Sequence, residues 1–460
     1  QGAGSSAVNS IQVDSFLDCL AESGLNSVGY AQGFDRQGKA DQALQDEAVL
    51  LAKNAKVVLL CMGLDEIKES EGLDRADMKL ADNQIELLQA VREANPNTVV
   101  IVNAGASLET PWLAHCKALV YGALGGQAGA GAMVDVLTGK INPGGKLAET
   151  WANAYDDTPA RDHFAGPGRT VQYREGLYVG YRYYQTAGVP VAFPFGHGLS
   201  YTQFAYSDLH ADAHSATLTV TNTGDRAGAE IVQLYVAKPN AEIFRPAQEL
   251  KAFAKVQLAA GESKTVTLTL DDKAFRYRNT RTDSWEVEGG TYELRVGASS
   301  ADIRLTAAVE VIGTDALNPY AGKALPHYQS GKVQTVPDAE WETLLDRPIP
   351  DDRVKIDRNM TLGELNHGRS PLGWLVWAVM TVLLNASYKK GKPDLNVLFQ
   401  YNMPLRALAK MTNGAISMGM VDGIVMEVQG FWVIGLVRVI FEAVKNVILN
   451  AQLENRLRNS

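Results

Sequence analysis

A charged segment from Leu64 to Lys79, LDEIKESEGLDRADMK, contains the residues whose types and spacing best suit chemistry. It directly follows the continuous apolar run from Val57 to Met62, which is typical of a buried strand. Ligands of open parallel sheets bind outside the carboxyl ends of the strands, so this position makes the segment a candidate site. Crowded carboxylates raise one another's pKa, and a general acid working near neutral pH needs such a shift. On charge alone, a solvated polar loop is the simpler interpretation.

The chain around this segment predicts an α/β sandwich with a mostly parallel sheet, which we assign to residues 1–190. Segments with apolar residues at helical spacing alternate there with short, wholly apolar runs. This alternation is typical of a parallel sheet that helices cover on both faces. The helix-like segments are 43–55, 83–94 and 132–137, and the strand-like runs are 57–62, 98–102 and 118–121.

Beyond about residue 205, apolar and polar residues alternate with a period of two. Turn signals such as Asn222-Thr223-Gly224-Asp225 separate these stretches at intervals of roughly ten residues. The pattern predicts an antiparallel β-sandwich, which we assign together with its linker to residues 191–312. The alternating stretches are 216–221, 230–236, 264–270 and 291–296.

The third part, residues 313–460, is predicted to begin as loop and to continue mainly as α-helix. Pro371 to Leu384 is an apolar run of about 14 residues, shorter than the ~20 that a membrane span needs. Apolar residues from Val433 to Ile448 recur at helical spacing, opposite polar residues such as Arg438 and Glu442. We expect these helices to pack on the body of the protein or on a partner subunit rather than on a membrane. A homodimer through the tail is therefore one expectation.

The overall composition narrows the class of protein. The 43 basic and 52 acidic residues give a net charge of -9, so we expect no nucleic-acid partner. An apolar fraction of 46% and a charged fraction of 21% exclude wholesale disorder and a polytopic membrane protein. Cys19, Cys61 and Cys116 are widely spaced among apolar neighbours, which predicts buried free thiols rather than a disulfide framework. So few cysteines fit a reducing compartment, and a cytoplasmic location is the expectation.

The sequence predicts neither a cofactor nor a metal. No group of His, Cys, Asp or Glu has the spacing of metal ligands. Gly125, Gly126 and Gly129 depart from the GxGxxG spacing and no GKS/T follows them, which argues against a flavodoxin-like nucleotide binder. These glycines more simply let a helix and a strand pack closely.

Five segments in order resemble signatures of the family-three glycoside hydrolases, which include β-glucosidases and β-xylosidases. Together they span roughly residues 1–312, and the last resembles a motif of a fibronectin type III-like domain. The tail, with MPLR at 403–406, resembles a helical extension of some bacterial members. The segments are ESEGLDR at 69–75, GGQAG at 125–129 with DVLTGKINPGGKL at 135–147, YREGLYVGYRYY at 173–184, FPFGHGLSYT at 193–202 and RPAQELKAF at 245–253.

The resemblance implies a retaining glycosidase built across two domains. A (β/α)₈ barrel would supply an aspartate nucleophile, and the α/β sandwich would supply the general acid/base at Glu71. A retaining enzyme needs two carboxyl groups ~5–5.5 Å apart, and a glycine-flanked loop could extend one of them across a cleft. Asp74 and Arg75 are expected to hold this loop, to tune the charge of Glu71 or to contact substrate. Gly4, Ser5 and Ser6 resemble a loop near the cleft; by residue type alone they are a flexible terminus.

The chain departs from the family pattern at its beginning. It starts at Gln1, no SDW-like nucleophile segment occurs, and the tail is too short for a barrel of ~250 residues. We therefore expect the C-terminal portion of a β-glucosidase that releases terminal non-reducing β-D-glucose from a β-glucoside or oligosaccharide. Its partner would be the missing barrel domain or chain. A β-xylosidase of the same family and a non-catalytic carbohydrate-binding or scaffolding module are the alternatives.

Overall fold

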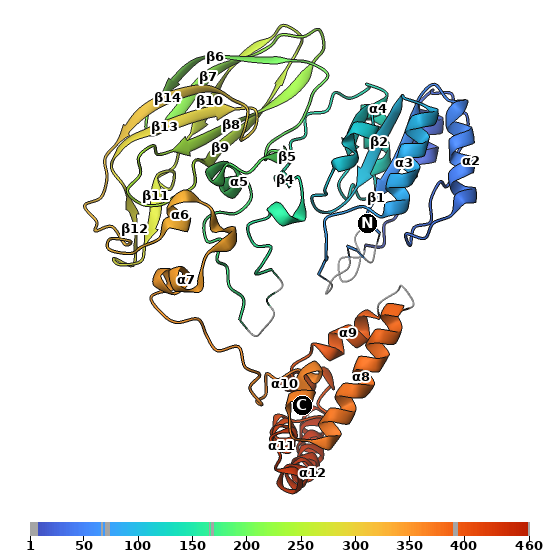
Figure 1. Cartoon of the computed structure of the whole chain (residues 1–460), viewed down its shortest axis with the longest axis vertical. Helices are drawn as coiled ribbons and strands as arrows, with labels where there is room; N and C mark the ends of the chain where they lie inside the picture. The colour runs from blue at the N-terminus through green and yellow to red at the C-terminus, as the bar shows by residue number, and fades with distance from the viewer. Residues whose placement is uncertain are drawn as a thin grey trace. The chain divides into compact units, whose positions relative to one another are not determined.

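The computed structural model describes residues 8–65, 68–69, 74–164, 166, 170–389 and 394–458. Its chain forms two compact units, of which the larger draws on residues up to 349 and the smaller mainly on residues 350–460 (Figure 1). The larger unit contains the two sheet-bearing layers expected from the sequence, and the smaller unit is helical. The boundaries predicted at residues 190 and 312 stay predictions.

The first layer of the larger unit is a parallel sheet flanked by helices, which confirms the predicted α/β sandwich (Figure 1). Its three strands lie in the order β1-β2-β3, and Val58 of β1 pairs with Thr98 of β2. Leu88 and Val100 are fully buried between helix and sheet. The elements are α1 (Phe16–Glu22), α2 (Gln42–Lys53), β1 (Val58–Gly63), α3 (Asp82–Ala94), β2 (Thr98–Asn103), η2 (Pro111–His115), β3 (Ala118–Tyr121) and α4 (Gly129–Leu137).

All three cysteines are free, as the sequence predicts, but the expectation that they are buried is wrong. Cys61 is exposed, and Cys19 and Cys116 are half-buried. Side chains along a strand point alternately to opposite faces of the sheet. Leu60 and Met62 occupy the buried face of β1, so Cys61 lies on the other face.

The second layer is the predicted antiparallel β-sandwich. A four-stranded sheet in the order β14-β13-β8-β9 and a three-stranded sheet in the order β10-β7-β6 enclose a common apolar core. Residues of β7 alternate between half-buried and buried along the whole strand, which is the period of two read from the sequence. The strands are β6 (Phe204–Ala211), β7 (Ser215–Asn222), β8 (Gly228–Ala237), β9 (Glu249–Leu258), β10 (Ser263–Thr269), β11 (Arg276–Asn279), β12 (Ser284–Val287), β13 (Gly290–Gly297) and β14 (Ile303–Val311).

Short elements between and after the two layers form a third, aromatic core. Tyr178, Tyr184 and Tyr328 are buried in it, and the ring of Phe244 packs against Tyr178 and Tyr328. Helices α6 and α7 therefore belong to the larger unit. The elements are β4 (Trp151–Ala152), η3 (Tyr155–Asp157), α5 (Tyr181–Ala187), β5 (Val191–Phe193), α6 (Pro326–Ser330), η4 (Val333–Thr335) and α7 (Asp338–Leu345).

The smaller unit is a bundle of helices with its own core, in agreement with the predicted helical tail. Met360, Leu405, Val421 and Val428 are buried at its centre. The pair Arg358 and Asp422 joins the chain before the first helices to α11 on the surface. The elements are η5 (Leu362–His367), α8 (Pro371–Lys389), α9 (Leu395–Tyr401), α10 (Leu405–Met411), α11 (Met418–Val428) and α12 (Trp432–Arg458).

Helix α8 is longer than the apolar run from which it was predicted. It has 19 residues, because the helix continues through the polar turn that ends at Lys389. Among the described residues, it is the one helix long and apolar enough to cross a membrane, judged by length and composition alone. Its Gly373 and Leu384 are buried against the rest of the bundle.

Candidate active site

The carboxyl end of β1 is fixed in place where the charged segment begins. The Gln84 side chain accepts a hydrogen bond from the Gly63 N–H at 3.0 Å and donates one to the Gly63 carbonyl at 2.9 Å. A Cβ at position 63 would collide with the backbone oxygen of Asn103, so only glycine fits this close approach of β1 and β2. The segment thus leaves the sheet from a rigid point.

The far end of the segment is held as well. The Met78 carbonyl accepts a hydrogen bond of 2.8 Å from the N–H of Glu109, which follows β2. Leu80 is buried in the core beneath the sheet edge. The Asp77 carboxylate accepts a hydrogen bond from the Lys79 N–H at 2.9 Å. The charged segment is therefore anchored to the α/β core on both sides.

The structure describes only some of the residues that the sequence predicted for the site. Glu71 lies outside the described residues, and so do Gly4, Ser5 and Ser6. Asp74 is exposed and Arg75 is half-buried. The roles predicted for all of these residues stay predictions.

The guanidinium of Arg75 is partly unsatisfied. Its Nε and Nη2 atoms are buried and have no hydrogen-bond partner in the described part of the chain. Buried donors in folded proteins are nearly always paired, so such atoms are suited to bind an acceptor from a ligand, from ordered water or from another domain. Arg75 is thus a stronger candidate for binding or positioning than its sequence alone suggested.

Glu109 is a positioning residue that the sequence analysis missed. Its carboxylate is buried and accepts a hydrogen bond from the Tyr155 N–H at 3.0 Å, while its carbonyl accepts one from the Trp112 indole. With its N–H bound to Met78, this one residue joins three loops at the sheet edge. A charged residue soon after an apolar run, followed by Thr-Pro-Trp, was the available signal.

A cavity of about 540 Å³ opens in the larger unit next to these loops. Met78 and Ser107, which follow β1 and β2, line one side of it. Thr150 Oγ1 is buried beside it without a hydrogen-bond partner, so this hydroxyl is available to a ligand or to water, whereas Arg182 Nε lies 3.7 Å from Glu249 Oε1. The remaining lining residues are Ala148, Glu149, Thr158, Pro159, Val179, Gly180, Tyr181, Tyr184, Phe195 and Leu250.

The tyrosine-rich segment at 173–184 has a mainly structural role, as its residue types suggested, with one exception. Tyr178, Tyr181, Tyr183 and Tyr184 are buried, but Tyr173 is 69% exposed and does not pack as predicted. Tyr173 precedes the turn that carries the chain into the core, which explains its exposure.

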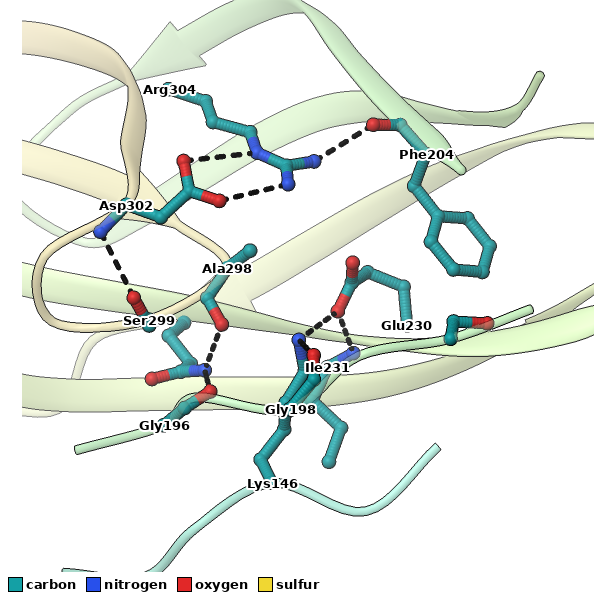
Figure 2. Close-up of polar contacts among 12 residues, drawn as sticks. Lys146, Gly196, Gly198, Phe204, Glu230, Ile231, Ala298, Ser299, Asp302 and Arg304 are labelled. Carbon is teal, nitrogen blue, oxygen red and sulfur yellow. Dashed lines mark hydrogen bonds and ion pairs between the residues drawn. The ribbon is translucent and has the colours of Figure 1, made fainter. Parts of the chain in front are cut away.

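The NPGGKL and FPFGHGLSYT segments join the α/β layer to the β-sandwich (Figure 2). Lys146 Nζ lies 3.1 Å from Glu230 Oε1 and donates a hydrogen bond of 3.1 Å to the Gly198 carbonyl. The Lys146 and Glu230 side chains are only 12% and 5% exposed. Glu230 also accepts a hydrogen bond from the Ile231 N–H at 2.8 Å. This buried ion pair is one of the contacts that hold the two layers in one compact unit.

Asn142 adds a second connection at the same junction. Its amide donates to the Ala227 carbonyl at 2.9 Å, and its oxygen accepts hydrogen bonds from Ser200 Oγ and the Tyr201 N–H. The sequence placed these segments in a family signature, and the geometry assigns them to domain packing rather than to chemistry.

The burial of His197 at this junction leads us to expect that the larger unit loses stability in mild acid. Burial and the nearby Lys146 ammonium lower the pKa of His197 below its ordinary value. Its stabilising contribution is thus complete above the unfolded pKa of about 6.5 and is lost as the pH falls toward the folded pKa. We expect the Tm of the larger unit to fall below pH 6.5, by roughly 2–4 °C for each kcal/mol lost.

The substitution His197→Phe tests this effect, because it preserves the packing of the ring 5.3 Å from Phe193 and removes the titrating group. Differential scanning calorimetry between pH 5 and 8 should show a flatter Tm profile for the variant. His214→Gln, at an exposed turn, is the control. An unchanged slope in His197→Phe would contradict the prediction.

Among the described residues, no three His, Cys, Asp or Glu side chains are grouped so as to hold a metal ion. A general acid must lie within hydrogen-bond reach of the leaving-group oxygen, and the sequence assigns that role to Glu71, which lies outside the described residues.

Comparison with known protein families identifies the class of this protein. Residues 1–201 match the Glycosyl hydrolase family 3 C-terminal domain, and residues 230–300 match the Fibronectin type III-like domain. The chain belongs to glycoside hydrolase family 3 and carries the C-terminal domains of that family. This agrees with the resemblance noted in its sequence.

Two curated relatives illustrate the similarity. The chain is 42% identical over 325 residues to "Thermostable beta-glucosidase B" of Acetivibrio thermocellus, covering 68% of this chain and 43% of that protein. It is 44% identical over 326 residues to "Exo-alpha-(1->6)-L-arabinopyranosidase" of Bifidobacterium breve, covering 69% of this chain and 43% of that protein. The chain therefore spans less than half the length of these relatives.

Solved structures of family 3 β-glucosidases are also similar to this chain. The crystal structure of a family 3 β-glucosidase from Bifidobacterium adolescentis matches with a TM-score of 0.66 and 41% identity, covering 72% of this chain and 50% of that one. The β-glucosidase from Kluyveromyces marxianus, solved in complex with glucose, matches with a TM-score of 0.57 and 40% identity. That match covers 60% of this chain and 34% of the other.

Proposed function

We propose that this chain supplies the general acid/base of a retaining β-glycosidase, and that Glu71 is that group. The anchored segment after β1 is the observation that carries the proposal. It leaves the sheet at Gly63, is tied again at Met78, and lies at the strand end where ligands bind in parallel sheets. Glu71 is one of three carboxylates of the ESEGLDR motif between these two anchors, and it is the one that the family resemblance matches to the acid/base.

The second carboxylate would come from a barrel domain, in the same protein or in a separate chain. Retention of configuration requires a nucleophile that attacks the anomeric carbon and an acid that protonates the leaving oxygen. After the first step, the deprotonated acid removes a proton from water, so one residue serves both steps. In this scheme the unpaired Nε and Nη2 of Arg75 bind an acceptor beside the loop and so help position it.

We propose a terminal, non-reducing β-D-glucosyl residue as the substrate group. Relatives named β-glucosidase support this choice, whereas the relative named arabinopyranosidase supports a related pentopyranoside. A β-D-xyloside is the third candidate. All three sugars carry an equatorial leaving group, so the same acid/base would serve each, and the choice among them rests with residues that contact the sugar ring.

Proton NMR of the reaction in real time tests this proposal. The protein assembled with its barrel domain is incubated with the p-nitrophenyl glycosides of β-D-glucose, β-D-xylose and α-L-arabinopyranose. We expect the glucoside to give the highest kcat/KM and the β-anomer of glucose to appear before mutarotation. First appearance of the α-anomer would contradict a retaining mechanism, and a higher kcat/KM for either pentoside would overturn the choice of glucose.

A further inference from the structure

Helix α12 presents its apolar side to solvent. It has 27 residues, and Val433 and Val447 on its outward side are 76% and 68% exposed. Solvent-exposed helix faces are normally polar, so a continuous exposed apolar stripe marks an interaction surface. The other large apolar residues exposed on this helix are Trp432, Ile434, Leu436, Val437, Ile440, Phe441, Val444, Ile448, Leu449, Leu453 and Leu457.

The orientation of α12 is set by a pair of glycines. A Cβ at Gly423 of α11 would lie 2.9 Å from the Gly435 oxygen, and a Cβ at Gly435 would lie 2.6 Å from the Gly423 oxygen. The two helices therefore meet backbone to backbone. This contact directs the Gly435 side of α12 inward and leaves the opposite side of the helix outward.

Two asparagines of α12 lie on the inward side. The amides of Asn446 and Asn450 donate hydrogen bonds of 2.7 Å and 3.0 Å to the Gly414 carbonyl, which precedes α11. The sequence suggested that residues of this side would face away from the packed surface. The structure instead packs the polar side inside its own bundle, so the apolar side is left for an external partner.

The exposed stripe has the spacing of a helix that pairs with another helix. Val433, Val437, Ile440, Val444 and Val447 are separated alternately by four and three residues. This is a heptad repeat with β-branched side chains at its core positions, a pattern typical of helices that associate in parallel or antiparallel pairs. The repeat was not needed for packing within the chain, because α11 contacts the other side of α12.

We propose that α12 packs against α12 of a second copy of this chain, forming a homodimer through the face defined by the five heptad residues. At about 1.5 Å per residue the helix is about 40 Å long, and covering a third of its circumference buries about 500 Å² per copy. The total of about 1,000 Å² reaches the size of a specific interface.

A lipid surface fits this face less well. Helices that lie in a membrane interface combine an apolar side with a free polar side rich in Lys and Arg. In α12 the polar side packs on α11 at Gly435, and its two central cations, Arg438 and Lys445, are already paired with Asp422 and Glu442. The β-branched residues at the heptad positions also suit the packing of a second helix.

Charge complementation at the middle of α12 tests the proposal. Val444 lies near the centre of the helix, where a two-fold axis brings it close to its counterpart in the second copy. In the full chain, Val444→Glu and Val444→Lys should each weaken the dimer about 1,000-fold, since a two-fold interface contains each change twice. Mixing the two variants should restore a dimer that contains one copy of each. Sedimentation velocity measures all three samples, with Gln452→Glu at an exposed position as the matched control.

Each outcome decides the proposal. Dimeric wild type, monomeric single variants and a restored mixed dimer support it. Monomeric wild type at micromolar concentration overturns it, and so does a dimer that neither variant affects. Flotation of the monomeric wild type with anionic vesicles would assign the face to a membrane instead. If either variant unfolds, oxidative cross-linking of Val444→Cys in the otherwise native chain is the substitute experiment. A cross-linking yield no higher than that of Gln452→Cys overturns the proposal.

Discussion

Replacing Glu71 with glutamine is expected to lower kcat for cellobiose by about 10²–10⁴-fold in the protein assembled with its barrel domain. Glutamine preserves the size of the side chain and cannot donate the proton that the departing sugar oxygen needs. For 2,4-dinitrophenyl β-D-glucoside the loss in the glycosylation step should be far smaller, because that leaving group departs without a proton. Steady-state and burst kinetics on both substrates measure the difference.

Asp74→Asn is the matched control for Glu71→Gln. It removes a carboxylate of the same motif whose side chain is exposed. We expect a loss below about 10-fold, similar for both leaving groups, because a positioning residue does not transfer the proton. Unchanged hydrolysis of cellobiose by Glu71→Gln, or an equal loss on both substrates in the glycosylation step, would exclude Glu71 as the acid.

Replacing Lys146 with methionine is expected to destabilise the larger unit by about 3–5 kcal/mol. The substitution leaves the Glu230 carboxylate buried without its cation, since the two side chains are 12% and 5% exposed. Urea unfolding followed by tryptophan fluorescence measures the change, with the m-value used to check that the transition is unaltered.

Two further variants separate the ion pair from simple packing. The double variant Lys146→Met with Glu230→Met replaces both charges by apolar groups, and its cost should be much smaller than that of the single change. Lys140→Met breaks a pair with Asp135 of similar length, but Lys140 is 73% exposed, so we expect at most about 1 kcal/mol. Equal losses for Lys146→Met and Lys140→Met would contradict the account of the junction.

Much of the fold could be predicted because its strands have simple patterns. The runs at 57–62, 98–102 and 118–121 are apolar throughout, as strands covered on both faces must be, and they became β1, β2 and β3. Strand β9, Glu249–Leu258, was not predicted as a strand, because the apolar Phe253 interrupts its alternation and lysines reduce its apolar content. Its place beside β8 at the edge of a sheet tolerates both these charges and the exposed Phe253.

The candidate site was predicted in part. Motif and strand position identified the segment after β1, but nothing in the sequence indicated that Gln84, in the first turn of α3, would bind both backbone groups of Gly63. The signal for a buried role of Glu109 was weak, since a single glutamate after a strand is normally solvated. Such contacts depend on side chains far apart in the sequence, which periodicity cannot relate.

The helical tail shows a different limit of prediction from sequence. Periodicity correctly gave a helix with an apolar stripe at Val433–Ile448, but it could not say which side of that helix would face inward. The close contact between Gly423 and Gly435 sets which side of α12 faces α11. The larger apolar side chains are therefore not buried within the bundle. The apolar stripe therefore became a surface rather than a core.

Azide rescue of Glu71→Ala is the most direct test of the central proposal, that this chain supplies the acid/base through Glu71. Azide needs no base to attack a glycosyl-enzyme, so with an activated aryl glucoside it should raise the rate and give β-glucosyl azide, detectable by NMR. Asp74→Ala should give glucose alone. Formation of the azide adduct by Glu71→Ala only is the predicted result; its absence from Glu71→Ala, or its appearance with Asp74→Ala instead, would contradict the proposal.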